Sequence, residues 1–151
     1  KYFETMKRIF ILLLTILPLI SSTARAEKDR PITFEQLPQK AQQFIQKYFA
    51  EEKIAFAKSE RDFFEIDYLV VFTSGKKIEF LRSGDWEKVD CRYSAVPTEL
   101  IPAQITNKIK ELYPEATVTV IDRGKYDIET KLNNGLELTF DLKYNLIDID
   151  N

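Results

Sequence analysis

Two stretches of the chain repeat one pattern, and this repetition constrains the fold more than any other feature of the sequence. Residues 74–90 read SGKKIEFLRSGDWEKVD, and residues 134–150, sixty positions later, read NGLELTFDLKYNLIDID. Each stretch begins with a glycine-containing turn and continues as a short alternating strand, a second turn and another strand. A pattern that recurs at a fixed spacing indicates one supersecondary unit present twice.

The similarity extends upstream of both stretches. Leu37-Pro38 is matched by Ile101-Pro102, and apolar residues follow each pair at the spacings of three and four that predict an amphipathic helix. The first apolar stripe consists of Leu37, Ala41, Phe44, Ile45, Tyr48 and Phe49, and the second of Ile105, Ile109, Leu112 and Tyr113. Between helix and hairpin, each unit has a short strand and a longer alternating strand, predicted at 54–58 and 63–73 in the first unit and at 118–120 and 126–132 in the second.

These elements predict an α+β fold built as a tandem repeat of one helix and four antiparallel strands. A single unit would have a thin core, so two units side by side bury more apolar surface than either alone. We therefore expect a continuous antiparallel sheet of about eight strands with both helices on one face. The other face stays open to solvent, as antiparallel sheets permit.

The first residues indicate export. Met6, taken as the start, precedes the basic pair Lys7-Arg8, the apolar run IFILLLTILPLI and small residues that end at Ala26. This order predicts a cleaved signal peptide at residues 1–26 and a periplasmic or secreted protein. The run is shorter than the roughly 20 residues of a membrane-spanning helix, so no membrane span is expected after cleavage. The remaining segments are interpreted as a lead-in (27–36), the first unit (37–91), a linker (92–100) and the second unit (101–151).

The composition excludes several kinds of chemistry. The chain has no histidine, which removes Ser-His-Asp and Cys-His catalytic sets and the commonest transition-metal ligand. None of its four glycines belongs to a phosphate-binding cluster. The net charge of −2, without any basic stripe, argues against a nucleic-acid partner. We therefore predict a protein that is not an enzyme, with no catalytic, cofactor-binding or metal-binding residues.

Two other features have more than one interpretation. Cys91 is the only cysteine and is interpreted as a small buried residue at a strand end, the alternatives being an intermolecular disulfide or a reactive thiol. Asp148 and Asp150 share one face of the last predicted strand, with Glu137 and Asp141 near them. A solvated acidic face is the main interpretation of these carboxylates, and a calcium site is the alternative.

The face of the sheet that points away from the helices differs between the two units. In the second unit its predicted residues are polar throughout: Asp127, Glu129, Lys131, Asn133, Glu137, Thr139 and Asp141. In the first unit, strand alternation places apolar residues there, which are Leu69, Val71, Leu81 and, if it points outward, Trp86. The charged residues that frame them are Glu65, Asp67, Lys77 and Glu79. Such a set predicts a protein-binding face, unless N-terminal residues or a loop cover it or Trp86 turns inward like its counterpart Leu146.

With these residues placed, the chain resembles the PepSY-like family of exported bacterial proteins, also described as beta-lactamase-inhibitor-like. The resemblance rests on the signal peptide, the paired Leu-Pro and Ile-Pro helix starts, YLVVFTSGKKIEFLRSGDWEKVDC, VPTELIP and NGLELTFDLKYNLIDID. It implies a tandem α+β fold similar to the beta-lactamase inhibitor, whose concave sheet face grips an enzyme. It supplies no catalytic residues, and one cysteine cannot reproduce the disulfides of that inhibitor.

The sequence thus predicts an exported, non-enzymatic module that binds an envelope or extracellular protein through the open sheet face. One alternative is an inhibitor of a peptidase or of another envelope enzyme. Alternatives of a different class are a small-ligand or calcium sensor and an enzyme of unfamiliar type.

Overall fold

The structure is a computed structural model that describes residues 29–62 and 65–151. The predicted signal peptide at 1–26 and the first residues of the predicted strand at 63–73 lie outside the described residues. No helix among those described is long and apolar enough to cross a membrane.

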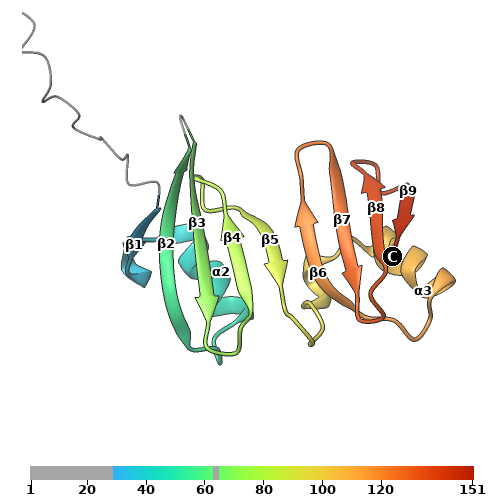
Figure 1. Ribbon diagram of the computed structural model, residues 1–151, viewed down its shortest axis with the longest axis horizontal. Helices are drawn as coiled ribbons and strands as arrows, with labels where there is room; N and C mark the ends of the chain where they lie inside the picture. The colour runs from blue at the N-terminus through green and yellow to red at the C-terminus, as the bar shows by residue number, and fades with distance from the viewer. Residues whose placement is uncertain (1–28, 63–64) are drawn as a thin grey trace, which may run out of the picture.

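The described chain forms one antiparallel sheet of nine strands whose spatial order is the same as their order in the sequence (Figure 1). The strands are β1 (Asp29–Ile32), β2 (Ile54–Asp62), β3 (Glu65–Phe72), β4 (Lys77–Phe80), β5 (Trp86–Asp90), β6 (Val118–Arg123), β7 (Asp127–Leu132), β8 (Glu137–Asp141) and β9 (Leu146–Asp150). This confirms the predicted α+β class and the antiparallel sheet. We call β2–β5 with the preceding helix the N-terminal half, and β6–β9 with theirs the C-terminal half.

Two α-helices lie behind the sheet on the same side (Figure 1). They are α2 (Gln39–Tyr48) and α3 (Ala103–Leu112), preceded by the short 3-10 helices η1 (Phe34–Gln36) and η2 (Thr98–Leu100). Pro38 and Pro102 occupy the residue just before each α-helix. A proline is tolerated there because the first backbone N–H groups of a helix have no intrahelical acceptor.

The predicted lead-in at residues 27–36 contributes strand β1, so the sheet has one strand more than the eight expected. β1 pairs with β2 from Asp29↔Glu60 to Ile32↔Ala57. With four residues and a proline, β1 shows no alternating pattern in the sequence. Ile32 packs partly against the core, which gives the strand an apolar anchor.

One continuous core fills the space between the helices and the sheet. Phe44 and Phe49 of the first helical stripe pack their rings on Phe80 and Phe72, at centroid distances of 5.7 and 5.6 Å. Across the joint between the halves, Val89 on β5 pairs with Ile121 on β6, and both side chains are fully buried. The two halves therefore share a single hydrophobic core.

Two residues of the predicted apolar faces are exposed instead. Leu112 is the last residue of α3 and is 41% exposed. Tyr126 precedes β7 in the turn after β6 and is 75% exposed. Both residues lie at the boundary of their element, where the helix or strand no longer covers the side chain.

Register shifts occur at corresponding places in the two halves. They lie between Ile54 and Phe56 in β2 and between Glu79 and Phe80 in β4, then between Val118 and Val120 in β6 and between Thr139 and Phe140 in β8. A β-bulge of this kind reverses which side chains of a strand point to the core. These shifts therefore decide which residues reach the open face.

Candidate protein-binding face

The register arranges the open face in rows that run across the strands. One row contains Phe56, Val71, Lys77, Asp90, Val120, Lys131, Glu137 and Asp150. The next contains Pro31, Lys58, Leu69, Glu79, Lys88, Asp122, Glu129, Thr139 and Asp148. Apolar side chains other than Val120 and Pro31 are confined to the N-terminal half of these rows.

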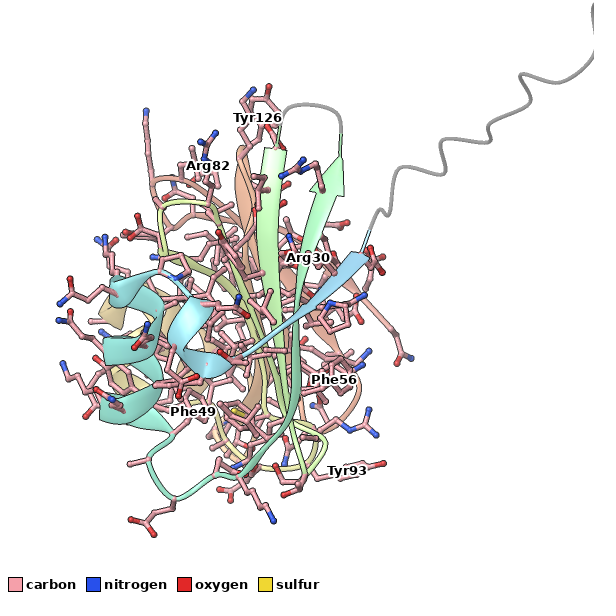
Figure 2. All side chains as sticks on the ribbon, turned by 90° about the vertical axis from the view of Figure 1, so that its left-hand side faces the viewer. Arg30, Phe49, Phe56, Arg82, Tyr93 and Tyr126 are labelled. Atoms are coloured by element: carbon pink, nitrogen blue, oxygen red, sulfur yellow. The ribbon has the colours of Figure 1, made fainter. Side chains whose placement is uncertain are left out.

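Phe56, Leu69 and Val71 form what we call the apolar patch. Phe56 lies directly across from Val71 and is 51% exposed, while Leu69 and Val71 are half-buried. Figure 2 shows Phe56 on the side of the sheet away from the helices, and Phe49 on the helix side. Leu81, just beyond the end of β4, is also exposed. Of the apolar residues predicted for this face, Leu81 is thus exposed, whereas Leu69 and Val71 are only half-buried.

Phe56 was missed by the sequence reasoning because strict alternation puts it on the same face as Ile54. The register shift between Ile54 and Phe56 turns Phe56 outward and Ala57 into the core. Ala57 is buried, whereas strict alternation would have buried Phe56 instead. The run Ile54-Ala55-Phe56-Ala57 carries no turn residue or glycine that would reveal the shift.

Trp86 does not belong to the open face, which corrects its place in the predicted set. It pairs with Phe80 on the helix side, and its ring centroid lies 6.0 Å from that of Phe44. The guanidinium of Arg123 on β6 lies 3.6 Å from the centroid of the Trp86 ring and donates a hydrogen bond to the Trp86 carbonyl oxygen. The register shift at this end of β5 turns Trp86 inward, as the alternative interpretation held.

Charged residues surround the apolar patch. Lys77 lies across from Val71, and Glu79 lies across from Leu69. Asp67 faces Glu60 on the neighbouring strand, and Glu65 is exposed at the start of β3. Of the four charged residues predicted to frame the apolar face, Lys77 and Glu79 thus lie directly across from it, whereas Asp67 and Glu65 lie nearer the start of β3.

Several carboxylates on this face hold protons more tightly than usual. Burial, followed by the repulsion of Glu65 and Glu60, raises the pKa of Asp67. Burial also raises the pKa of Glu79, with Asp122 and Glu60 acting in the same direction and Lys88 opposing them. Burial and Asp122 raise the pKa of Glu87. A positive group arriving at this face would relieve the repulsion among these carboxylates.

The C-terminal half of the face is polar and internally paired. Lys131 forms an ion pair with Glu137 at 2.6 Å, and at the joint Lys88 of β5 forms one with Asp122 of β6 at 2.8 Å. Glu129 is exposed at the position that corresponds to Leu69. This half therefore lacks an apolar anchor comparable to the patch.

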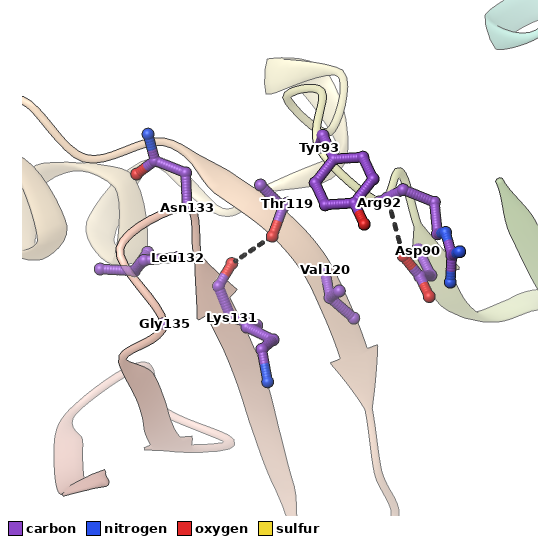
Figure 3. Close-up of a pocket in the computed structure, with 9 residues that line it drawn as sticks. All are labelled: Asp90, Arg92, Tyr93, Thr119, Val120, Lys131, Leu132, Asn133 and Gly135. Carbon is purple, nitrogen blue, oxygen red and sulfur yellow. Dashed lines mark hydrogen bonds between the residues drawn. The ribbon is translucent and has the colours of Figure 1, made fainter. Parts of the chain in front are cut away.

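A depression of about 430 Å³ lies near the start of β6 (Figure 3). The Arg92 backbone N–H donates to the Asp90 carboxylate at 2.8 Å, and the Thr119 hydroxyl donates to the Lys131 carbonyl at 3.3 Å. Tyr93 beside it is 93% exposed. The nine residues that line it include no nucleophile held by a general base, so they supply no recognisable catalytic set.

The remaining sequence candidates have structural roles. Cys91 is buried, and burial raises the pKa of its thiol to about 11, so it remains protonated and packs as a small apolar residue. The Asp141 carboxylate accepts hydrogen bonds from the backbone N–H groups of Lys143 and Asn145 in the β8–β9 turn. Asp150 faces Glu137, but residues 29–62 and 65–151 contain no group of three or more acidic or cysteine side chains able to hold a metal ion.

Comparison with known proteins places the chain in a family. The model of the family described as "Putative beta-lactamase-inhibitor-like, PepSY-like" matches residues 66–148. The chain belongs to the PepSY-like family. No curated protein matches it.

Solved structures of similar proteins support this assignment. One, from Bacteroides vulgatus, is described as a "putative periplasmic protein from DUF2874 family"; it is 48% identical, with a TM-score of 0.80, and the match covers 83% of this chain and 99% of that one. Another, from Bacteroides thetaiotaomicron, is described as a "putative calcium-regulated periplasmic protein"; it is 52% identical, with the same TM-score and coverage. A third, from Bacteroides vulgatus and described as a "putative periplasmic protein of unknown function", is 31% identical, has a TM-score of 0.78 and covers 82% of this chain and 99% of that one.

Proposed function

We propose that this PepSY-like protein is an exported, non-enzymatic module that binds another protein of the cell envelope or its surroundings. The binding surface is the open sheet face of the N-terminal half, centred on Phe56, Leu69 and Val71 with Leu81 at its margin. Glu65, Asp67, Lys77 and Glu79 frame it and select a partner of complementary charge. Export agrees with the signal-peptide pattern of residues 1–26 and with the periplasmic descriptions of the similar structures.

One observation carries the proposal, namely the asymmetry between the halves. Corresponding positions of one sheet hold Leu69 and Val71 in the N-terminal half and Glu129 and Lys131 in the C-terminal half. Packing against α2 and α3 cannot explain apolar residues on the opposite face of the sheet. Apolar side chains within a charged frame are typical of protein interfaces, where burial in the complex offsets their cost in solvent.

We also infer that the two halves are copies of one unit, as the sequence pattern predicts. The order of a 3-10 helix, an α-helix and four strands occurs twice, and the register shifts fall at corresponding residues. On this inference one copy retains a polar outer face while the other has acquired a binding surface.

The test is affinity capture of the mature protein's partner from its own cell envelope, with identification by mass spectrometry. Leu69→Asp combined with Val71→Lys is expected to abolish capture while leaving the melting temperature nearly unchanged. The matched control, Glu129→Lys with Lys131→Asp, changes the corresponding positions and should retain capture. If both double variants capture the partner as well as the wild type does, the open face is not the binding surface.

The family description favours a more specific version, in which the bound protein is an enzyme that the interaction inhibits. Stoichiometric loss of an envelope peptidase's activity on addition of the purified protein would support inhibition. Binding without any loss of the enzyme's activity would contradict inhibition and would leave the proposal of protein binding standing.

Calcium is a second candidate, favoured by the description of the 52% identical structure as calcium-regulated. The carboxylates of the open face, including Asp67 and Glu79, would supply hard oxygen ligands if they were to gather around an ion. Calorimetric titration of the mature protein with calcium tests this directly. Heat at micromolar calcium that disappears in Asp67→Asn would support it, and no heat up to millimolar calcium would exclude it.

A further inference from the structure

The last strands of the two halves, β5 and β9, are held in the same way. Trp86 pairs with Phe80 and Val89 with Ile78; likewise Leu146 pairs with Phe140 and Ile149 with Leu138. Lys88 of β5 thus corresponds to Asp148 of β9. The inner edges of the two strands are therefore equivalent.

Their outer edges differ. β6 covers β5, with the pairs Lys88↔Asp122, Val89↔Ile121 and Asp90↔Val120. Within the described part of the chain, β9 pairs with β8 alone, so the backbone groups on its other edge have no strand partner. Val89 is fully buried, whereas Ile149 is 40% exposed and Ile147 is 59% exposed.

The other end of the sheet is protected in a way that β9 is not. β1 is a short edge strand whose Pro31 has no backbone N–H to offer to an incoming strand. β9 reads Leu-Ile-Asp-Ile-Asp, which alternates β-branched and acidic residues and contains neither proline nor lysine. An extended segment can therefore add to β9 more readily than to β1.

A cleft lies beside β9, at the place that corresponds to the side chain that β6 contributes beside β5. In the N-terminal half, Arg123 from β6 lies over Trp86. In the C-terminal half, Leu146 takes the place of Trp86 and lines a cleft of about 510 Å³ together with Leu112, Lys108 and Tyr144. Leu112, which is 41% exposed at the end of α3, would contact a partner's side chain placed in this cleft.

The charge on β9 indicates the chemistry of the incoming segment. In the β5–β6 pair, Lys88 meets Asp122 at 2.8 Å. β9 has an acid at the position of Lys88, so the matching residue of a partner strand would be basic. A second copy of this chain fits less well, because antiparallel pairing of two β9 strands places carboxylates opposite each other when it is centred on Asp148 or on Ile149.

We propose that the outer edge of β9 binds an extended segment of a partner protein by strand addition, with an apolar residue opposite Ile149 and Lys or Arg opposite Asp148. This edge is separate from the apolar patch. The incoming segment would pair with β9 in the way that β6 pairs with β5 in the same molecule.

Two peptides based on β6 test the proposal. One has the β6 sequence, VTVIDR, and the other has lysine in place of the aspartate, VTVIKR, each with blocked ends. Titrated into the isotope-labelled mature protein and followed by NMR, the lysine peptide is expected to shift amide signals of residues 146–150 and of the end of α3. It should bind about five- to tenfold more tightly than the aspartate peptide, because a cross-strand charge pair changes from repulsive to attractive.

A charge swap keeps the test independent of folding. Asp148 is exposed, so Asp148→Lys should leave the circular dichroism spectrum unchanged and reverse the preference of the two peptides. Leu69→Asp with Val71→Lys should leave peptide binding unchanged, which separates this inference from the proposed function. The inference is overturned if neither peptide shifts residues 146–150, if Asp148→Lys does not alter the preference, or if sedimentation shows a dimer that Ile149→Lys dissociates.

Discussion

The N-terminal and C-terminal halves share one strand order, corresponding register shifts and one continuous core, yet their open faces differ. Facing the helices, Ile78 and Phe80 in one half correspond to Leu138 and Phe140 in the other, and all four are fully buried. Facing solvent, Phe56, Leu69 and Val71 correspond to Val120, Glu129 and Lys131. At these positions both halves keep apolar residues in the core, whereas the open face changes from apolar to charged at two of the three.

This contrast separates residues that maintain the fold from residues available for function. A buried position accepts few side chains because neighbouring atoms fill the surrounding space. An outward position on an open sheet has no such constraint, so an apolar residue there needs a reason outside the fold. The C-terminal half therefore serves as an internal reference for the open face of the N-terminal half.

The largest effect is expected from emptying the core at corresponding positions. Phe80→Ala and Phe140→Ala should each lower the free energy of unfolding by about 3–5 kcal/mol, because each removes a fully buried ring. Urea denaturation followed by circular dichroism measures both values, with Tyr126→Ala as the exposed control. A single transition in all variants is expected, since the halves share a core. Two transitions, or a negligible loss in Phe140→Ala, would show that the halves are not equivalent.

A smaller effect on the free energy of unfolding should distinguish the turn that contains Gly84 from the turn that contains Gly135. Gly84, between β4 and β5, has φ 82°, and an added Cβ would lie 2.8 Å from the Pro38 Cβ at the start of α2. Gly84→Ala should lower the free energy of unfolding by about 2–4 kcal/mol, through backbone strain together with the clash. At Gly135 an added Cβ meets nothing within 4 Å, so Gly135→Ala should cost about 1 kcal/mol from strain alone. Thermal denaturation compares the two variants. An equal fall in melting temperature would contradict the close contact of the β4–β5 turn with α2.

The smallest effect concerns pH. The raised pKa of Glu79 means that the folded protein binds this proton more tightly than the unfolded chain, whose pKa is near 4.5. The contribution of Glu79 to stability is therefore present at low pH and is lost as the pH rises through the folded-state value. Glu79→Gln should raise the free energy of unfolding at pH 7 by less than about 1 kcal/mol, and the gain should vanish by pH 4.

Denaturant unfolding of Glu79→Gln and wild type at both pH values measures this difference. Glu129→Gln changes an exposed carboxylate in the same row and is the matched control. A gain that is equal at pH 4 and pH 7 would show that the protonation of Glu79 is not its cause.

Much of the architecture could be predicted from residue alternation. The inward positions Ile78, Phe80, Leu138 and Phe140 alternate regularly, and the glycine turns mark the hairpins, so the antiparallel sheet and its buried face follow from the pattern. β1 could not be predicted, because four residues that include Pro31 carry no periodic signal.

The open face was harder to predict than the core. Leu69 and Val71 were placed correctly because β3 has no register shift over these residues. Phe56 was missed, and the orientation of Trp86 was left open between the two faces, because a bulge reverses strand parity without a mark in the sequence. Protein binding by the open face of the N-terminal half stays a prediction.

Site-specific photo-crosslinking tests the central claim most directly. A photoreactive phenylalanine analogue would replace Leu69 in the apolar patch, Glu129 at the corresponding position of the C-terminal half, or Gln46 on the exposed side of α2. After irradiation in the cell envelope, we predict that position 69 yields one discrete adduct with another protein, and that positions 129 and 46 yield little of it. Equal adducts from all three positions, or an adduct from Gln46 alone, would contradict a binding surface on the open face of the N-terminal half.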